Sequence, residues 1–357
     1  TDNRQDAALQ AGHFNDFVFV TLLRGAILAA LDRAGDSGIQ EDQVGAAIQR
    51  ELGFVAREVG RRTEWLMEPD LRGANQVSAE KTIRDALVHR FWVDQRRGWR
   101  YTNPNLEQLQ LVQVDYLSLD ELAADDSAFQ ADPLLAAAST DERARALRSL
   151  FDVMRKGLAV ECSALDPVQI ESLTGRMRGV IKSPWAIEEN TARSATTFVT
   201  DPRARREISA KDELLLLRGS PRSAVGRELR LRTFAGIRPN QKQVESIIGV
   251  LLTAAKAYGI AIPVVSPFGG EGWRLVPSAI VFKRRDALSE DKTNPFFREL
   301  YTSIADLLAK GGQALFGFEG REHTAQVESD LRELREARFR YGQDDRKTLQ
   351  NKQERLR

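Results

Sequence analysis

The sequence is poor in the residues that usually build metal sites and covalent cross-links. Its 357 residues include one cysteine and three histidines. The lone Cys162 excludes an internal disulfide bond and a zinc site made of several cysteines, and it fits a reducing cytoplasm, where we expect the protein to lie. No two histidines lie four residues apart, which excludes a helical metal pair. We therefore expect no metal site.

Long apolar runs and an excess of one charge are absent as well. The apolar stretch 17–31 is interrupted by Arg24 and Gly25, so it is predicted to be a buried helix and not a membrane span. No signal peptide is recognisable, and the sequence opens at Thr1, which leads us to expect a piece of a larger protein. The formal net charge is +1, so nucleic-acid affinity would have to come from local basic patches.

Motifs for catalysis are missing too. The sequence contains no G-x-x-x-x-G-K-[ST] loop to hold nucleotide phosphates, and no Gly-x-Ser-x-Gly elbow for a serine nucleophile. The acidic pairs Asp120-Glu121, Asp141-Glu142 and Asp212-Glu213 lie on helix-like stretches, where they are poorly placed to hold magnesium. We expect no catalytic residues and no cofactor in this polypeptide, and no ATP hydrolysis by it alone.

Apolar periodicity and capping residues predict a mainly helical chain. Helices are expected over 6–33 with Gly35 as the stop, over 39–53, after a cap at Ser78, from Ser139 with Asp141 and Glu142 in the first turn, from Asp166-Pro167, over 241–258 and from residue 294. The stretch 54–76 is expected to be rich in loops. Small β elements complete an α+β fold.

Two stretches share an order of helix, strand, turn and strand. In the first, residues 91–94 and 99–102 flank a polar turn; in the second, residues 260–265 and 273–276 flank a glycine-rich turn, and residues 278–282 follow as a further strand. Gly-Trp-Arg opens the later strand in both, at 98–100 and 272–274, which suggests a duplicated unit. A helix followed by a two-stranded wing is typical of a winged helix-turn-helix.

Residues 218–242, hereafter the basic segment, carry the strongest local charge signal. Seven cations face one acid, Glu228; the cations are Arg218, Arg222, Arg227, Arg230, Arg232, Arg238 and Lys242. Such a set suits phosphate contacts, and Arg96, Arg97, Arg100 and Arg274 in the predicted wings extend it. The alternative is a solvated face balanced by acids elsewhere, which the overall neutrality permits.

The remaining candidates have plain structural alternatives. Trp99 and Trp273 could stack on bases, but an aromatic residue at the start of a strand is more often part of the core. His13 is predicted to be packed beside Phe14, and His89 to face solvent. Cys162 is predicted to be a small buried apolar residue.

The two ends of the chain resemble the second motor lobe of large bacterial superfamily-two (DEAD/DEAH-box) DNA helicases, some of which act in antiphage defence. The resemblance rests on Asn3-Arg4-Gln5-Asp6-Ala7 with the following residues 13–18, and on a strand and helix carrying His323, Arg332, Phe339 and Gly342. Ser329 departs from the pattern, because many relatives have Gln there. The intervening residues resemble, more loosely, an insertion carried by that lobe.

This resemblance implies a partial RecA-like lobe with a large insertion of two winged-helix-like units and a helical middle. The implied divisions are 1–34 (first lobe helix), 35–117 (first winged-helix-like unit), 118–205 (helical connector), 206–290 (second such unit) and 291–357 (return to the lobe and a charged tail). ATP and magnesium are expected only in the parent enzyme.

The expected function is a DNA-binding accessory region of an ATP-dependent helicase. Expected partners are duplex or forked DNA, the rest of the motor and proteins of a defence or repair complex. The expected contact residues are Asn3, Arg4, His323, Arg332, Arg222, Arg227, Arg230, Arg232, Arg96 and Arg97. A protein–protein interaction scaffold is the alternative, and an independent ATPase is the weakest interpretation.

Overall fold

The structure, a computed structural model, describes residues 2–55, 62–96, 103–187, 191–200, 216–266, 270–285 and 293–311, with backbone only for residues 2–16. It is an α+β fold in which helices predominate and the sheets are small, as expected from the sequence. The chain divides into two compact units, one of Thr1–Val20 with Ala314–Arg357 and the other Thr21–Gln313. Of the first unit, only the helix residues 2–20 are described. The second unit contains every other element below.

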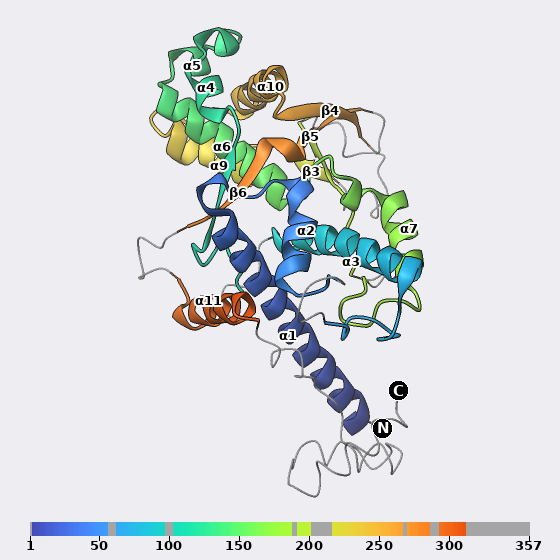
Figure 1. The fold of residues 1–357 in the computed structure, drawn as a ribbon. Helices are drawn as coiled ribbons and strands as arrows, with labels where there is room; N and C mark the ends of the chain where they lie inside the picture. Colours follow the sequence, from blue (N-terminus) through green and yellow to red (C-terminus); the bar gives the residue numbers. More distant parts are fainter. Residues whose placement is uncertain are drawn as a thin grey trace, which may run out of the picture. The chain divides into compact units, whose positions relative to one another are not determined.

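The elements follow one another along the chain as Figure 1 shows. The helices are α1 (Asp2–Ala34), α2 (Glu41–Glu51), α3 (Gly73–Asp94), α4 (Leu119–Ala124), α5 (Pro133–Ala137), α6 (Thr140–Lys156), α7 (Pro167–Met177), α9 (Ala224–Glu228), α10 (Gln241–Ala257) and α11 (Pro295–Ala309). The strands are β1 (Val112–Tyr116), β2 (Thr197–Val199), β3 (Leu216–Arg218), β4 (Ala261–Val265), β5 (Glu271–Leu275) and β6 (Ile280–Arg284).

Helix boundaries follow local capping chemistry. Ser139 caps α6 in a reciprocal box with Glu142, and Asn240 caps α10 in the same way with Gln243. The Asp166 side chain accepts from the Gln169 amide at 3.0 Å at the start of α7. Gly35, which follows α1, has a φ of 60°, a conformation that costs glycine little. These helices confirm the expectations from the sequence.

A buried arginine joins α1, α3 and α11 within the second unit. Arg24 is 3% exposed and forms an ion pair with Asp94 of α3 at 2.7 Å. Its Nη1 donates to the Tyr301 hydroxyl of α11 at 2.8 Å and to the Pro104 carbonyl at 2.9 Å, and also to the Asn103 side chain. Burial alone would lower the pKa of Arg24, but Asp94 and Tyr301 raise it above its ordinary value. The guanidinium therefore stays charged inside the core.

Close packing brings α11 onto α1 at Gly25. A Cβ atom at Gly25 would lie 2.3 Å from Cγ2 of Ile304, so the helices can approach this closely only without a side chain there. Tyr301 is fully buried one turn away. The contact joins segments that lie almost 280 residues apart in sequence.

Two small sheets lie within the second unit. In the first, β1 and β6 pair antiparallel with Val114 opposite Phe282, and Ile39 forms a further antiparallel bridge to Phe282. In the second, the strand order is β3-β2-β5-β4, with β2 parallel to β3 and antiparallel to β5. Strands β4 and β5 form an antiparallel hairpin directly after α10.

The prediction of the first wing is wrong in its first strand. Residues 91–94, predicted as a strand, form the last turn of α3. Phe91 and Trp92 are buried there, with the Phe91 ring centroid 4.7 Å from that of Phe282. The helix also begins earlier than expected, at Gly73 and not after a cap at Ser78. Residues 97–102, which hold the rest of that wing, lie outside the described residues.

The second predicted unit is reproduced in its local elements. The helix over 241–258 and the following hairpin are present as α10, β4 and β5. The next strand, β6, pairs with β1 and not with the hairpin. The RecA-like lobe and the winged-helix character of the insertion remain predictions.

Replacing Arg24 should destabilise the second unit strongly. Arg24→Ala leaves the Asp94 carboxylate and the Tyr301 hydroxyl without their partner, and breaking a buried ion pair costs about 3–5 kcal/mol. Urea unfolding followed by circular dichroism measures the loss.

Arg176→Ala is the matched control for that experiment. Arg176 pairs with Asp85 at 3.0 Å, but both side chains are more than a third exposed, so the loss should stay below about 1 kcal/mol. Equal losses in the two variants would contradict the role assigned to Arg24.

Candidate nucleic-acid interface

The basic segment is built on a short capped helix and an unusually wide turn. Ser223 caps α9, and its side chain accepts from the Gly226 amide at 3.1 Å and donates to the Ser220 carbonyl at 2.6 Å. After α9 the chain enters a π-helical turn, Leu229–Thr233, in which the Phe234 amide donates to the Leu229 carbonyl at 2.8 Å. Such wide turns are rare in proteins, and those that occur often lie at functional sites.

Apolar anchors hold this segment in place. Val225 and Leu229 are fully buried and Phe234 is 5% exposed, and α9 packs against α6, as Figure 1 shows. A Cβ atom at Gly226 would lie 2.0 Å from the Ser220 carbonyl oxygen. The turn at 220–223 can therefore fold against α9 only because residue 226 is glycine.

Most cations of the basic segment reach solvent and form no ion pair with a described carboxylate. Arg222, Arg227, Arg232, Arg238 and Lys242 are exposed, and Arg230 is half-buried. Only Arg232 among these six forms an ion pair within the described residues, with Glu228 at 3.2 Å. The Nε atom of Arg230 is enclosed by protein and bonds to no described residue. Among the residues that the structure describes, no carboxylate therefore pairs with the other five of these cations.

A groove of about 1210 Å³ runs beside the basic segment. Arg145, Arg148, Ser149, Asp152, Val153 and Lys156 line it from α6, and Ala224, Glu228 and Arg232 line it from the basic segment, together with residues before β1 and at the start of α11. Part of its charge is compensated: Lys156 pairs with Glu107 at 2.8 Å, and Arg148 pairs with Asp115 at 3.7 Å. Arg222, Arg227, Arg238 and Lys242 of the basic segment do not line the groove.

A buried ionic network supports the wall of the groove. Arg155 is fully buried and donates to Glu107 at 2.8 Å, to Gln95 at 3.1 Å and to the Tyr116 hydroxyl at 3.2 Å. Burial raises the pKa of Glu107, but Arg155 and Lys156 outweigh it and leave that pKa below its ordinary value. Burial also raises the pKa of Tyr116 well above its ordinary value. Every partner is satisfied, which is typical of a structural network.

The structure places the expected contact residues in different regions. Arg222, Arg227, Arg230 and Arg232 lie together on the basic segment. Arg96 is exposed just after α3, and its carbonyl accepts from Asn105 at 3.0 Å. Asn3 and Arg4 lie on α1, with side chains outside the described residues, and Arg97, His323 and Arg332 lie outside them entirely.

Two residue assignments from the sequence need comment. His89 was expected to face solvent, but it is 1% exposed and its Nδ1 lies 2.8 Å from the Ala164 carbonyl; this expectation was wrong because α3 is covered there by residues 163–165. Burial lowers the pKa of His89. Trp273 is 8% exposed on β5 and belongs to the core.

Cys162 is buried as expected. Its thiol donates to Glu41 Oε1 at 3.2 Å. Burial, with the Glu41 carboxylate, raises the pKa of the thiol to about 12, which makes it unreactive at neutral pH.

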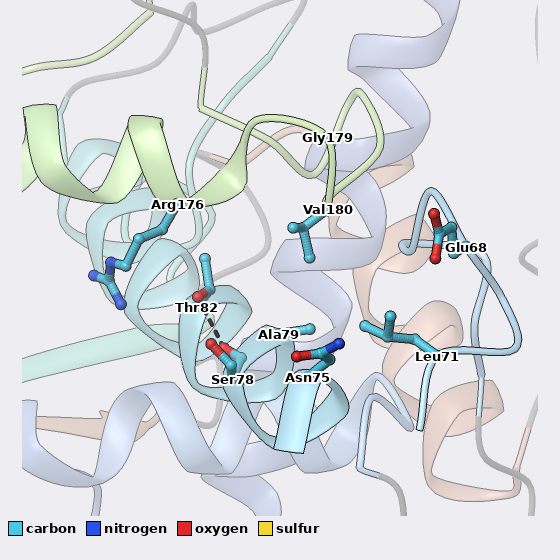
Figure 2. A pocket seen from close by; sticks show the side chains of 9 residues that line it. All are labelled: Glu68, Leu71, Asn75, Ser78, Ala79, Thr82, Arg176, Gly179 and Val180. Atoms are coloured by element: carbon cyan, nitrogen blue, oxygen red, sulfur yellow. Dashed lines mark hydrogen bonds between the residues drawn. The ribbon is translucent and has the colours of Figure 1, made fainter. Parts of the chain in front are cut away.

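A second, smaller pocket of about 280 Å³ lies between α3 and the end of α7, and Figure 2 shows its lining side chains. Two of its polar side chains have partners: Arg176 pairs with Asp85, and the Thr82 hydroxyl donates to the Ser78 carbonyl at 2.8 Å. None of the expected contact residues lies in it. We therefore assign it no role.

The described residues contain no group of three or more His, Cys, Asp or Glu side chains placed to hold a metal ion. None of their helices combines the length and the apolar character that crossing a bilayer requires.

Comparison of the chain with protein-family models, with curated proteins and with solved structures gave no match.

Replacing Gly226 should loosen the basic segment. Gly226→Ala forces a Cβ atom against the Ser220 carbonyl and the Pro221 backbone, so we expect a loss of about 1–3 kcal/mol from overpacking. Thermal unfolding and trypsin cleavage at Arg227 should both detect it. Gly249→Ala in α10 is the control, because no atom lies within 4 Å of its new Cβ; there we expect a gain of about 0.5–1 kcal/mol. Equal effects at both positions would contradict the packing argument.

The Glu107 network should make stability sensitive to acid. Because the pKa of Glu107 in the folded protein lies below its ordinary value, its contribution to stability is present above the ordinary pKa and is lost as the pH falls through the lowered pKa. Glu107→Gln should reduce the free energy of unfolding by about 1–3 kcal/mol at neutral pH. The difference between this variant and the unsubstituted chain should shrink in acid. Urea unfolding from neutral pH into acid measures it, with Glu299→Gln, at an exposed site on α11, as the control. A difference independent of pH would contradict the prediction.

Proposed function

We propose that this chain is a nucleic-acid-binding region and that the basic segment is its contact surface for duplex or forked DNA. One observation carries the proposal: among the described residues, Arg222, Arg227, Arg230, Arg238 and Lys242 form no ion pair with any carboxylate. Their guanidinium and ammonium groups are suited to phosphate oxygens. The alternative is a solvated face balanced by acids elsewhere in the chain, and it predicts no salt-dependent binding of DNA.

The size of the expected effect follows from counterion release. Each phosphate that a cation neutralises adds about 0.9 to the slope of log affinity against log salt. Four or five such contacts would make binding steeply salt-dependent even though the whole chain carries a net charge of only +1. Affinity would thus come from a local surface and not from the overall field of the protein.

The parent protein in this proposal is an ATP-dependent superfamily-two DNA helicase. This part rests on the resemblance of the two chain ends to the second motor lobe, and the segment 314–342 lies outside the described residues. The ATP cycle of the parent would move this lobe while the inserted region grips the duplex. The hairpin of β4 and β5 after α10 would serve as a wing in that arrangement.

The groove favours a second function, an interaction scaffold. Its mixed lining of paired charges with Leu109, Val153 and Leu217 suits a polypeptide segment better than a phosphate backbone. The ion pair between Arg232 and Glu228 points the same way. A scaffold requires no salt-dependent DNA binding, which separates the two functions.

Removing two cations should weaken DNA binding in a recognisable way. The 357-residue chain is titrated into a fluorescein-labelled forked duplex, and anisotropy is read at several salt concentrations. The double variant Arg227→Ala/Arg230→Ala should bind more weakly, and its salt slope should fall by about 2, because each lost phosphate contact removes about 1.

Arg176→Ala provides the control, since Arg176 is paired with Asp85 away from the basic segment. It should leave affinity and slope unchanged. If the unsubstituted 357-residue chain fails to bind the forked duplex at low salt, or binds it with a flat salt dependence, the proposed function is refuted and the scaffold is favoured.

A further inference from the structure

The basic segment also presents two bare aliphatic side chains. Leu231 is 61% exposed and Ile237 is 58% exposed. Arg230 and Arg232 flank the first, and Arg238 follows the second. They are two of the ten large apolar side chains exposed among the described residues, and they are the two that lie on the basic segment.

The backbone around both residues is held in uncommon conformations. The π-helical turn Leu229–Thr233 buries Leu229 and Thr233 and leaves Leu231 and Arg232 exposed. Arg238 has a φ of 51°, which is unusual for a residue with a side chain. The amides of Ile237 and Arg238 both donate to the Phe234 carbonyl, at 3.0 and 2.9 Å. Uncommon backbone conformations of this kind gather at functional sites.

The composition of the basic segment favours a duplex over a single strand as its nucleic-acid ligand. Single strands are usually held by exposed aromatic side chains on which bases stack. Phe234 is the one aromatic residue within the basic segment, and it is 5% exposed. Proteins that deform duplex DNA instead insert aliphatic wedges between base pairs from the minor groove and hold the flanking phosphates with arginines.

We infer that Leu231 and Ile237 act as wedges that enter base steps of duplex DNA, while the arginines next to them in the sequence hold phosphates of the same duplex. The inference rests on the proposed function and specifies its ligand: a duplex that is unstacked or easily unstacked at the point of contact. A mismatch, a flexible step or a fork junction fits that description, because opening it costs less than opening a paired step.

The test compares two duplexes of equal length, one fully paired and one with a single central mismatch flanked by 2-aminopurine. Both carry the same phosphates, so their salt slopes should agree. The unsubstituted chain should bind the mismatched duplex about fivefold to tenfold more tightly than the paired one, because less stacking is lost at the mismatch. Binding should also raise the 2-aminopurine fluorescence.

The wedge variant is Leu231→Ala/Ile237→Ala. It should lose the preference for the mismatch and the rise in fluorescence while it keeps the salt slope of the parent chain. Leu307→Ala, at an exposed leucine on α11, should keep both. Thermal unfolding of each variant verifies that it folds.

The outcomes separate the inference from the function on which it rests. If the parent chain binds both duplexes equally, or if the wedge variant keeps the preference, the inference is refuted and salt-dependent binding stands. If the chain binds no duplex but does bind anionic phosphatidylserine vesicles, the surface is a membrane contact, and both the inference and the proposed function fail.

Discussion

In the second unit, one buried guanidinium joins segments that lie far apart in the sequence. Arg24 on α1 contacts Asp94 at the end of α3, the chain at Asn103 and Pro104, and Tyr301 on α11. These segments are far apart in sequence, so bringing them together costs loop-closure entropy. The contacts with Arg24 offset that cost only when all of the segments are in place. A buried charge tolerates no substitute geometry, because an unpaired guanidinium in the core is strongly unfavourable. Arg24 therefore specifies how the first and last described helices of this unit pack on its core.

Burial of some arginines with their partners explains how a nearly neutral chain can keep other cations exposed. Arg24, Arg143 and Arg155 are buried and engaged by carboxylates, carbonyls and hydroxyls. These arginines are used in folding. The cations of the basic segment differ, since Val225, Leu229 and Phe234 provide its anchorage and its charged side chains are left for other uses. Net charge does not reveal this division of roles.

Sequence reasoning predicted features set by neighbours along the chain. The caps at Ser139 and Asp166, the stop at Gly35 and the helix over 241–258 are local, and all are present. It failed where distant contacts decide. Residues 91–94 look like a strand, but Phe91 and Trp92 pack as helix residues against Phe282, and short apolar runs are ambiguous in sequence. Pairing of β1 with β6, the burial of His89 and the wide turn at Leu229–Thr233 have no local signal. The cluster of cations was visible in the sequence. The exposure of Leu231 was not, nor was the absence of an ion pair between five of these cations and any described carboxylate.

Arginine footprinting tests the central claim most directly. The full chain is treated with phenylglyoxal in the presence and absence of duplex DNA, and modified arginines are located by mass spectrometry. The account predicts that Arg222, Arg227, Arg230 and Arg238 react in the free protein and become protected by DNA. Arg24 and Arg155 should resist modification in both states, and Arg176 should react equally in both. Protection confined to Arg145 and Arg148 in the groove, or no protection at all, would contradict the assignment of the basic segment as the nucleic-acid interface.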